Sequence, residues 1–172
     1  MRGALLGSLV AAALPVAAWA MTEEELATKA SEMAISPLPG QYRVRHELLG
    51  FEAPGTSRTA MRQMRAVFAE GLAEGNTVCV GLQDGAGQAG LRMLEDLTEG
   101  ACDFESLEVA GEAIDADMQC RYENNLLSHV AMAARIAPES SEAVMTLEQN
   151  IGGVVLVIAT VRATTERTGE CA

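Results

Sequence analysis

The chain has few aromatic residues and few basic ones. Phe, Tyr and Trp make up 3% of its 172 residues, and there is a single tryptophan. Twelve Lys and Arg stand against 24 Asp and Glu, which gives a formal net charge of −12 at pH 7. Base stacking needs aromatic platforms, and acidic surfaces repel phosphate groups. The net charge therefore opposes binding to nucleic acid and to anionic membrane surfaces, while the dispersed acids aid solubility.

Metal-site signatures are also missing. The cysteines form no CxxC pair, the histidines no HxxxH pair, and His46 and His129 are far apart. Structural zinc sites show such close ligand spacing, so we expect no zinc. The thioethers of Met61 and Met64 are soft copper ligands, but no Cys or His is near them in the sequence. Methionine is a common filler of cores, and we expect a core role for this pair. The sequence predicts no metal and no cofactor.

The first twenty residues have the pattern of a secretory leader. Arg2 precedes an apolar run over 4–17, and Ala18-Trp19-Ala20 fits the small-x-small cleavage rule. The alternative is an uncleaved anchor, which the shortness of the run disfavours. No cysteine follows the cleavage site, so a lipoprotein is not expected. We expect a protein that begins at Met21, lies in the periplasm or is secreted, and has no membrane span after cleavage.

The cysteine count fits such an exported chain. The four cysteines, an even number, lie at positions 79, 102, 120 and 171, after the leader. In an oxidising compartment this favours two disulfides, although four cysteines allow three connectivities.

The remaining length suits one domain, over 39–172, preceded by a short segment. Residues 21–38 are expected to form an N-terminal helix, capped by Thr22, or a loose tail. From Gln41 onward apolar residues alternate with charged ones, which predicts a half-buried strand. Apolar residues then recur at helical spacing over 58–74, as one stripe that comprises Met61, Met64, Val67, Phe68 and Leu72.

A short strand over 77–81 precedes a glycine-rich segment. Residues 85–90, GAGQAG, match the GxGxxG pattern of dinucleotide-binding loops, and a helix is expected over 89–98. We reject nucleotide binding, because exported proteins rarely meet NAD and the strands that follow look like hairpins rather than parallel βαβ units. The segment is expected to be a flexible glycine loop.

The second half of the chain consists of short alternating segments. Strands are predicted over 126–136, 142–149 and 153–167, after a pair of strands on either side of Gly111. Strands joined by tight turns indicate an antiparallel meander. The expected fold is mainly β: a curved antiparallel sheet, cupped or barrel-like, with two short helices inserted between the first strands.

The strands on either side of Gly111 predict a disulfide. If the turn is Ala110-Gly111-Glu112, counting outward places Cys102 opposite Cys120. Directly opposed residues of an antiparallel pair lie close enough for a bridge. Phe104 follows the face of Cys102, whereas Leu107 and Val109 fall on the other face, so a bulge is expected between them. By elimination, Cys79 pairs with Cys171.

These segments resemble the domain of unknown function 3617 family. The resemblance covers residues 39–171 and is carried by a leader followed by PGQYRV, TVCV, CDFESLEVAGEAIDADMQC and RTGEC. It implies a bacterial, exported, mostly β protein whose biochemical role is not established. The chain departs from the family pattern after Cys79, where GLQDGAGQAG replaces a helix start of the Thr-Pro-Glu kind.

Two classes of function remain. The first is a non-catalytic envelope protein that binds a small apolar molecule or a protein partner in the concavity of the sheet. The alternative is a periplasmic hydrolase that uses His46 or His129 with an acid. No GxSxG motif occurs, Ser128 and His129 point to opposite faces of a strand, and His46 lies on an apolar face. The chain is therefore more easily understood as a binding protein than as an enzyme.

A cation site is a third hypothesis. Asp115 and Asp117 share one strand face, but the glycine and the bidentate glutamate of an EF-hand loop are missing. We expect these carboxylates to form a solvated surface.

Overall fold

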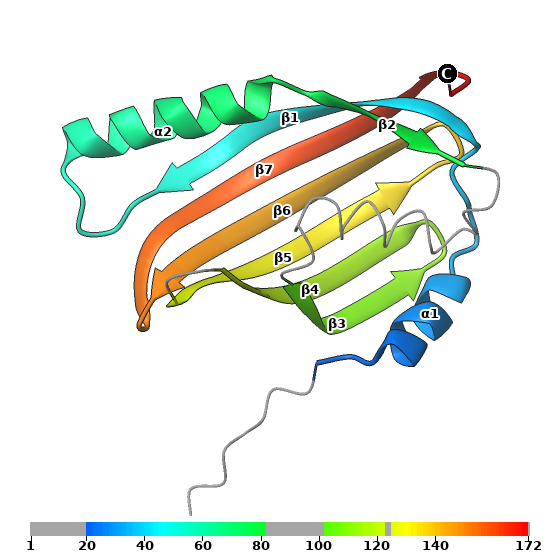
Figure 1. The fold of residues 1–172 in the computed structure, drawn as a ribbon, viewed down its shortest axis with the longest axis horizontal. Coiled ribbons are helices and arrows are strands. Elements are labelled where there is room, and N and C mark those ends of the chain that lie inside the picture. Colours follow the sequence, from blue (N-terminus) through cyan, green and yellow to red (C-terminus); the bar gives the residue numbers. More distant parts are fainter. Residues whose placement is uncertain (1–19, 82–101, 123–124, 172) are drawn as a thin grey trace, which may run out of the picture.

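The computed structural model describes residues 20–81, 102–122 and 125–171. In that part of the chain, two helices and seven strands follow one another (Figure 1). They are α1 (Glu23–Ser31), β1 (Gly40–Glu52), α2 (Arg58–Ala73), β2 (Asn76–Val80), β3 (Cys102–Ala110), β4 (Ala113–Arg121), β5 (Leu126–Ile136), β6 (Ser140–Ile151) and β7 (Val154–Gly169). The strands form one antiparallel sheet in the order β2-β1-β7-β6-β5-β4-β3. The expected fold class is confirmed.

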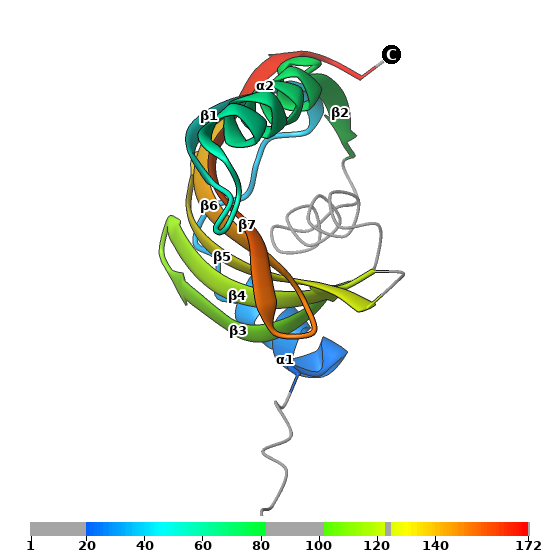
Figure 2. The ribbon, with the colours of Figure 1, turned by 90° about the vertical axis from the view of Figure 1, so that its left-hand side faces the viewer.

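The sheet is cupped rather than closed. Its edge strands are β2 and β3, which do not pair with each other, so the barrel-like alternative is not realised. Figure 2 shows the strands bending around a concave side, with α2 near one edge of the sheet and α1 near the other. The contacts of the helices agree with this view, because α2 lies against β1 and α1 against β3.

The strands are longer than the alternation of apolar residues predicts. β5 has the predicted bounds, but β6 extends beyond 142–149 because polar residues at both of its ends still pair with β7. β1 continues past Leu48 to Glu52, with a register shift between Leu48 and Gly50. Backbone pairing carries these strands beyond the segments whose side chains are buried.

The two described helices begin at well-defined caps. Thr22 caps α1 through a capping box with Glu25, and the first turn carries three glutamates, so the expected N-terminal helix is present. Ser57 caps α2, which lies between β1 and β2 as predicted. The second helix expected between the first strands, over 89–98, lies outside the described residues, as does GAGQAG.

The β3–β4 hairpin corrects one detail of the sequence prediction. Its turn has two residues rather than three, because Ala110 pairs with Ala113. Gly111 adopts a φ of 67°, a left-handed conformation that glycine tolerates. The expected bulge is present between Phe104 and Ser106, and it returns the register so that Cys102 pairs with Cys120. The shorter turn and the bulge compensate for each other.

The bulge also completes the core. It places Phe104 and Leu107 on the same face, where both are buried. They belong to a cluster contributed by β3, β4 and β5, whose members are Phe104, Leu107, Ile114, Ala116, Met118 and Met132. Met21, Leu26 and Met33 of the N-terminal segment pack against this cluster. The N-terminal segment is therefore part of the folded unit and not a tail.

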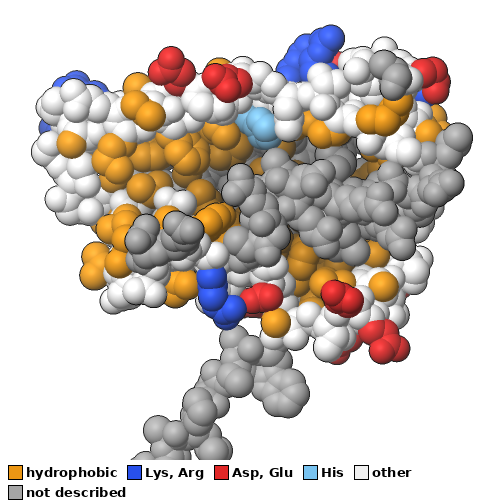
Figure 3. Space-filling model, in the orientation of Figure 1, with side chains coloured by type: hydrophobic (Ala, Val, Ile, Leu, Met, Phe, Trp, Pro, Cys, Tyr) orange, Lys and Arg blue, Asp and Glu red, His pale blue; other side chains and the backbone are white. Residues whose placement is uncertain are grey.

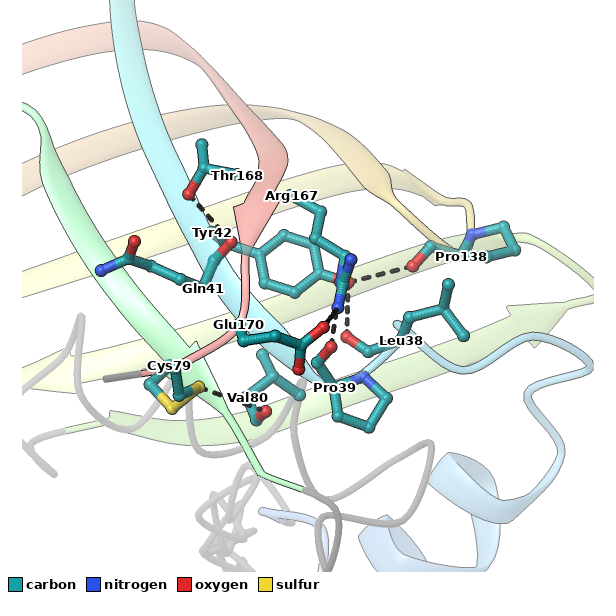
Figure 4. A network of polar contacts seen from close by, with 11 residues as sticks. Leu38, Pro39, Gln41, Tyr42, Cys79, Val80, Pro138, Arg167, Thr168 and Glu170 are labelled. Carbon is teal, nitrogen blue, oxygen red and sulfur yellow. Dashed lines mark hydrogen bonds and ion pairs between the residues drawn. A yellow bond between two sulfur atoms is a disulfide. The ribbon is translucent and has the colours of Figure 1, made fainter.

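A polar network joins the start of β1 to the end of β7 (Figure 4). The Tyr42 hydroxyl lies 2.7 Å from the Leu38 carbonyl oxygen and 3.0 Å from that of Pro138, in the β5–β6 turn. Arg167 donates from Nε to the Pro39 carbonyl oxygen at 2.9 Å. A Cβ atom on Gly40 would clash with the backbone carbonyl oxygen of Gly169 and lie 2.6 Å from this Nε, so only glycine fits there.

Two disulfides are present, as an even cysteine count predicts. Cys102 joins Cys120 within the β3–β4 hairpin, and Cys79 of β2 joins Cys171, just after β7. The second bridge closes the same end of the sheet as the Tyr42 network (Figure 4).

Candidate functional site

The concave side of the sheet contains a cavity of about 460 Å³. The sheet provides one wall, and α2 with the start of β2 provides the other. Apolar side chains line most of it: Phe68, Leu72, Met118, Val130, Met145, Leu147 and Val161, with Cys120 beside them. In the space-filling view, hydrophobic side chains gather in the hollowed part of this face (Figure 3). A volume between 300 and 1,000 Å³ is typical of small-molecule sites.

Strand register builds the floor of this cavity. Met118 pairs with Val130, and Val130 pairs with Leu147, so these three side chains form a row across β4, β5 and β6. Met145 pairs with Val161 and begins the neighbouring row. Next to Leu147, the partner on β7 is Ala159, which is fully buried. The period of two in each strand thus becomes a continuous apolar surface.

A few polar groups border the cavity. His46 of β1, Glu74 and Asn76 near the start of β2, and Tyr122 after β4 contribute to its lining. His46 is half-buried on the apolar face of β1, as the sequence predicted. In an otherwise apolar site, a small number of polar groups fixes the orientation of a ligand that is mostly apolar.

His129 lies on the opposite, convex side of the sheet. Its Nε2 is 3.6 Å from Asp117 Oδ1 and 3.8 Å from Glu105 Oε2. Ser106 donates a hydrogen bond to Asp117 Oδ2 at 3.1 Å, not to the histidine. Ser128 is fully buried and His129 half-exposed, so their side chains do lie on opposite faces.

This arrangement does not provide a nucleophile and its base. Within the described ranges, neither histidine is hydrogen-bonded to a hydroxyl or a thiol group. A hydrolase needs a nucleophile within reach of a base that a third group orients. His129 has two acids beside it and no such nucleophile, and His46 faces an apolar cavity.

The candidate metal ligands do not converge. Among the residues that the structure describes, no three of His, Cys, Asp and Glu are grouped to hold an ion. Asp115 lies exposed on the convex face, and Asp117 contacts Ser106 and His129 instead. For the methionine pair, the core prediction holds only in part. Met61 is half-buried, but Met64 is 38% exposed.

The stripe predicted on α2 is therefore too wide. Val67 is 71% exposed, and no residue of α2 is fully buried. Met61, Phe68 and Leu72 lie within one arc of the helix, while Met64 and Val67 fall outside it, toward the side that Gly71 occupies. The tilted rings of Phe51 and Phe68 lie 5.7 Å apart and hold the helix on β1.

The cavity itself was not predictable residue by residue. The sequence indicates which strand residues are apolar, and it does not indicate whether a facing element covers them. One signal was Gly71, a residue of low helix propensity in the last turn of α2, which lies on the wall of the cavity.

One further observation concerns membranes. Considering only the described residues, no helix is long and apolar enough to cross a bilayer.

Comparison with known proteins gives a family and no function. No curated protein and no solved structure matches the chain. Residues 37–171 match the family described as "Protein of unknown function (DUF3617)". This span begins just before β1, ends at Cys171 and contains both disulfides. The chain belongs to the DUF3617 family.

Proposed function

We propose that this protein is exported and binds a small apolar molecule, without catalysis, in the cavity on the concave side of its sheet. The observation that supports this is the lining of that cavity, in which apolar side chains of four strands and one helix face a space of about 460 Å³. Enclosing apolar surface of a ligand is favourable by about 25 cal/mol per Å².

Export is supported by two features. The first twenty residues have the pattern of a leader, and the two disulfides are typical of an oxidising compartment. The leader pattern favours the periplasm or the medium as the place of action.

The polar border of the cavity suggests the class of ligand. His46, Asn76 and Tyr122 offer hydrogen bonds at the border, whereas the floor is aliphatic. A molecule with an apolar body and one polar group, such as a fatty acid, satisfies both parts. A hydrolase is not proposed, because the described histidines lack a partner nucleophile.

The test uses N-phenyl-1-naphthylamine, a dye that fluoresces in apolar sites, and a variant that fills the cavity. Gly71 lines the cavity, and a Cβ atom built on it would meet nothing within 4 Å. Gly71→Trp therefore adds a large side chain without a clash at its base. We expect saturable dye binding to the wild type and an affinity at least about tenfold lower, or ~1.4 kcal/mol, in this variant. Competition by a fatty acid should displace the dye.

The matched control is Ala66→Trp, which places the same side chain on an exposed part of the same helix. It should bind the dye like the wild type. In the protein that begins at Met21 the added indole is the only tryptophan, and its emission should lie further to the blue at position 71 than at position 66. Absence of saturable dye binding to the wild type, or equal loss in both variants, would show the proposal to be wrong.

A further inference from the structure

Exposed apolar side chains gather at one end of the sheet. In the described part of the chain, eight large apolar residues are exposed, and six of them form what we call the apolar rim: Met64, Val67, Tyr122, Ile151, Val154 and Leu156. Val154 is 64% exposed and pairs with Ile151 across the Gly152-Gly153 turn. Isolated exposed apolar residues are ordinary, but several at one end indicate an interaction surface.

The elements that carry the rim converge in space. Glu52, the last residue of β1, pairs with Ile158, so the β6–β7 turn projects beyond the end of β1. α2 begins directly after that end, at Arg58. Figures 1 and 2 show the start of α2 and the β6–β7 turn on the same side of the molecule.

The rim is continuous with the cavity. Tyr122 belongs to both, since it lines the cavity and is 40% exposed. On α2, Met64, Phe68 and Gly71 follow one another at a spacing of four and three residues, so they share a face. Phe68 and Gly71 line the cavity, and Met64 extends this apolar face toward the start of the helix.

The charges at this end differ from those of the whole chain. Between Glu148 and Arg162 no residue is charged, and between Glu52 and Glu70 the chain carries three arginines and no acid. Arg58, Arg62 and Arg65 are all exposed, and none of them forms an ion pair with a described residue.

The position of these arginines does not stabilise α2. The start of a helix carries partial positive charge, so acids stabilise it and bases do not. α1 follows this rule with three glutamates in its first turn, whereas α2 has no acid there and begins with Arg58. Both the helix end and the arginines are thus suited to an anion outside the molecule.

We propose that this end of the molecule docks on an anionic lipid surface, with the apolar rim inserted among the acyl chains and the arginines of α2 contacting phosphate groups. This proposal rests on the proposed function, because docking at the rim would place the ligand-binding cavity beside a source of apolar ligand. A net charge of −12 repels such a surface at long range. The arginines act only within about 10 Å, the range over which salt leaves charges unscreened.

The apolar rim is tested first, with the protein that begins at Met21 and unilamellar vesicles in a sedimentation assay. Wild type should bind vesicles of phosphatidylcholine with phosphatidylglycerol more tightly than phosphatidylcholine alone. Val154→Asp should reduce binding to both kinds of vesicle at least about tenfold, because it places a charge in the inserted rim. The matched control is Leu38→Asp, since Leu38 is 43% exposed and lies outside the rim. It should change little.

The arginines are tested with two triple variants of equal charge. Arg58→Gln, Arg62→Gln and Arg65→Gln together should weaken binding to the anionic vesicles by about fivefold per residue and leave the neutral ones unaffected. Arg43→Gln, Arg45→Gln and Arg135→Gln remove three exposed arginines that line a separate, polar groove. Equal losses in the two triples would mean that only net charge matters, and the proposal would be wrong.

Two other outcomes also overturn the docking proposal. If the wild type binds neither kind of vesicle, the rim does not bind lipid. If the wild type sediments as an oligomer in solution and Val154→Asp converts it to a monomer, the rim is a contact between copies of the chain. Dye binding separates this test from that of the cavity. Gly71→Trp should lose dye binding and retain vesicle binding. Either kind of binding can fail without the other.

Discussion

At the scale of single residues, the buried hydroxyl group of Tyr42 has the clearest expected effect on stability. Its side chain is 3% exposed as a residue, and its hydroxyl reaches two carbonyl oxygens from separate segments. Burial raises the pKa of Tyr42, and Glu139 adds to this, while Arg167 and the bond to Leu38 act in the opposite direction. The protonated form is therefore the one that the folded protein favours.

This gives a mutational and a pH prediction. Tyr42→Phe removes the hydroxyl and with it the part-buried hydrogen bonding to the Leu38 and Pro138 carbonyl oxygens, which should cost about 0.5–1.5 kcal/mol of unfolding free energy. Because the pKa is raised on folding, the contribution of Tyr42 is complete below about pH 10, the value in an unfolded chain. It is lost as the pH rises through the folded value. Urea unfolding at neutral and alkaline pH measures both effects.

Tyr122→Phe is the matched control, since Tyr122 is 40% exposed and no described residue is hydrogen-bonded to its hydroxyl. It should leave stability within about 0.5 kcal/mol of the wild type. If Tyr42→Phe and Tyr122→Phe have the same alkaline profile as the wild type, the hydroxyl of Tyr42 is not the group that titrates.

Residue roles differ in how far the sequence predicts them. Thr22 as a helix cap follows from its own side chain and its neighbours, so it was predictable. Gly40 is different. It follows two prolines and has the pattern of an ordinary helix breaker, while the need for glycine comes from the Gly169 carbonyl oxygen and Arg167, far away in the chain. Contacts between distant segments are invisible in a local pattern.

At the scale of elements, the two disulfides differ in what they close. The bridge between Cys102 and Cys120 spans 18 residues within one hairpin, and that between Cys79 and Cys171 spans 92. In the chain-entropy account, these loops are worth about 3 and about 4.5 kcal/mol. The longer loop also ties edge strand β2 to the end of β7.

Replacing each pair by alanine should show this order. Cys102→Ala with Cys120→Ala should lower the melting temperature and leave the protein folded, because backbone pairing still holds the hairpin. Cys79→Ala with Cys171→Ala should lower it further. Alanine is the better choice because Cys120 is 1% exposed and serine would bury a hydroxyl. Calorimetry of both variants decides the order, and a larger loss for the hairpin pair would contradict the loop-entropy argument.

The positions of the helices and strands were largely predictable from the sequence. Which of their side chains are buried was less predictable. The sequence predicted β5 to the residue, the Thr22 cap predicted α1, and the helical spacing of apolar residues predicted α2. The stripe on α2 was wrong at Met64 and Val67, since helical spacing gives an arc but not how much of it another element covers. The turn of the β3–β4 hairpin was wrong by one residue, because a bulge elsewhere in the strand can offset it.

At the scale of the whole molecule, an open cup has two edges to protect. Edge strands offer unpaired backbone groups, and natural sheets cover or shorten them. β2 is short, with five residues. β3 is longer and receives the N-terminal segment, where Met21 donates a backbone hydrogen bond to the Phe104 carbonyl oxygen at 2.8 Å. The curvature of the sheet was expected from the sequence. For residues 21–38 the sequence left open a helix or a loose tail, so the covering of β3 by this segment was not predicted.

The family match begins at residue 37 and leaves α1 outside it. The structure nevertheless packs Leu26 and Met33 against the buried cluster of β3, β4 and β5. Deleting residues 21–36 should therefore leave a folded but weaker sheet. Partial burial of these apolar side chains is worth about 3 kcal/mol in total, which corresponds to a fall of roughly 6–12 °C in melting temperature. The deleted protein should also bind a dye such as anilinonaphthalene sulfonate at its uncovered face.

A second variant separates loss of packing from loss of chain. Leu26→Asp with Met33→Asp keeps the full length of the N-terminal segment but removes its apolar contacts, so it should approach the melting temperature of the deletion. Ala27→Asp with Ser31→Asp adds the same two charges on exposed positions of the helix and should have little effect. If the deletion and the Leu26 and Met33 variant both melt like the wild type, the N-terminal segment does not protect the sheet. The edge of β3 would then be stable through its pairing with β4 alone.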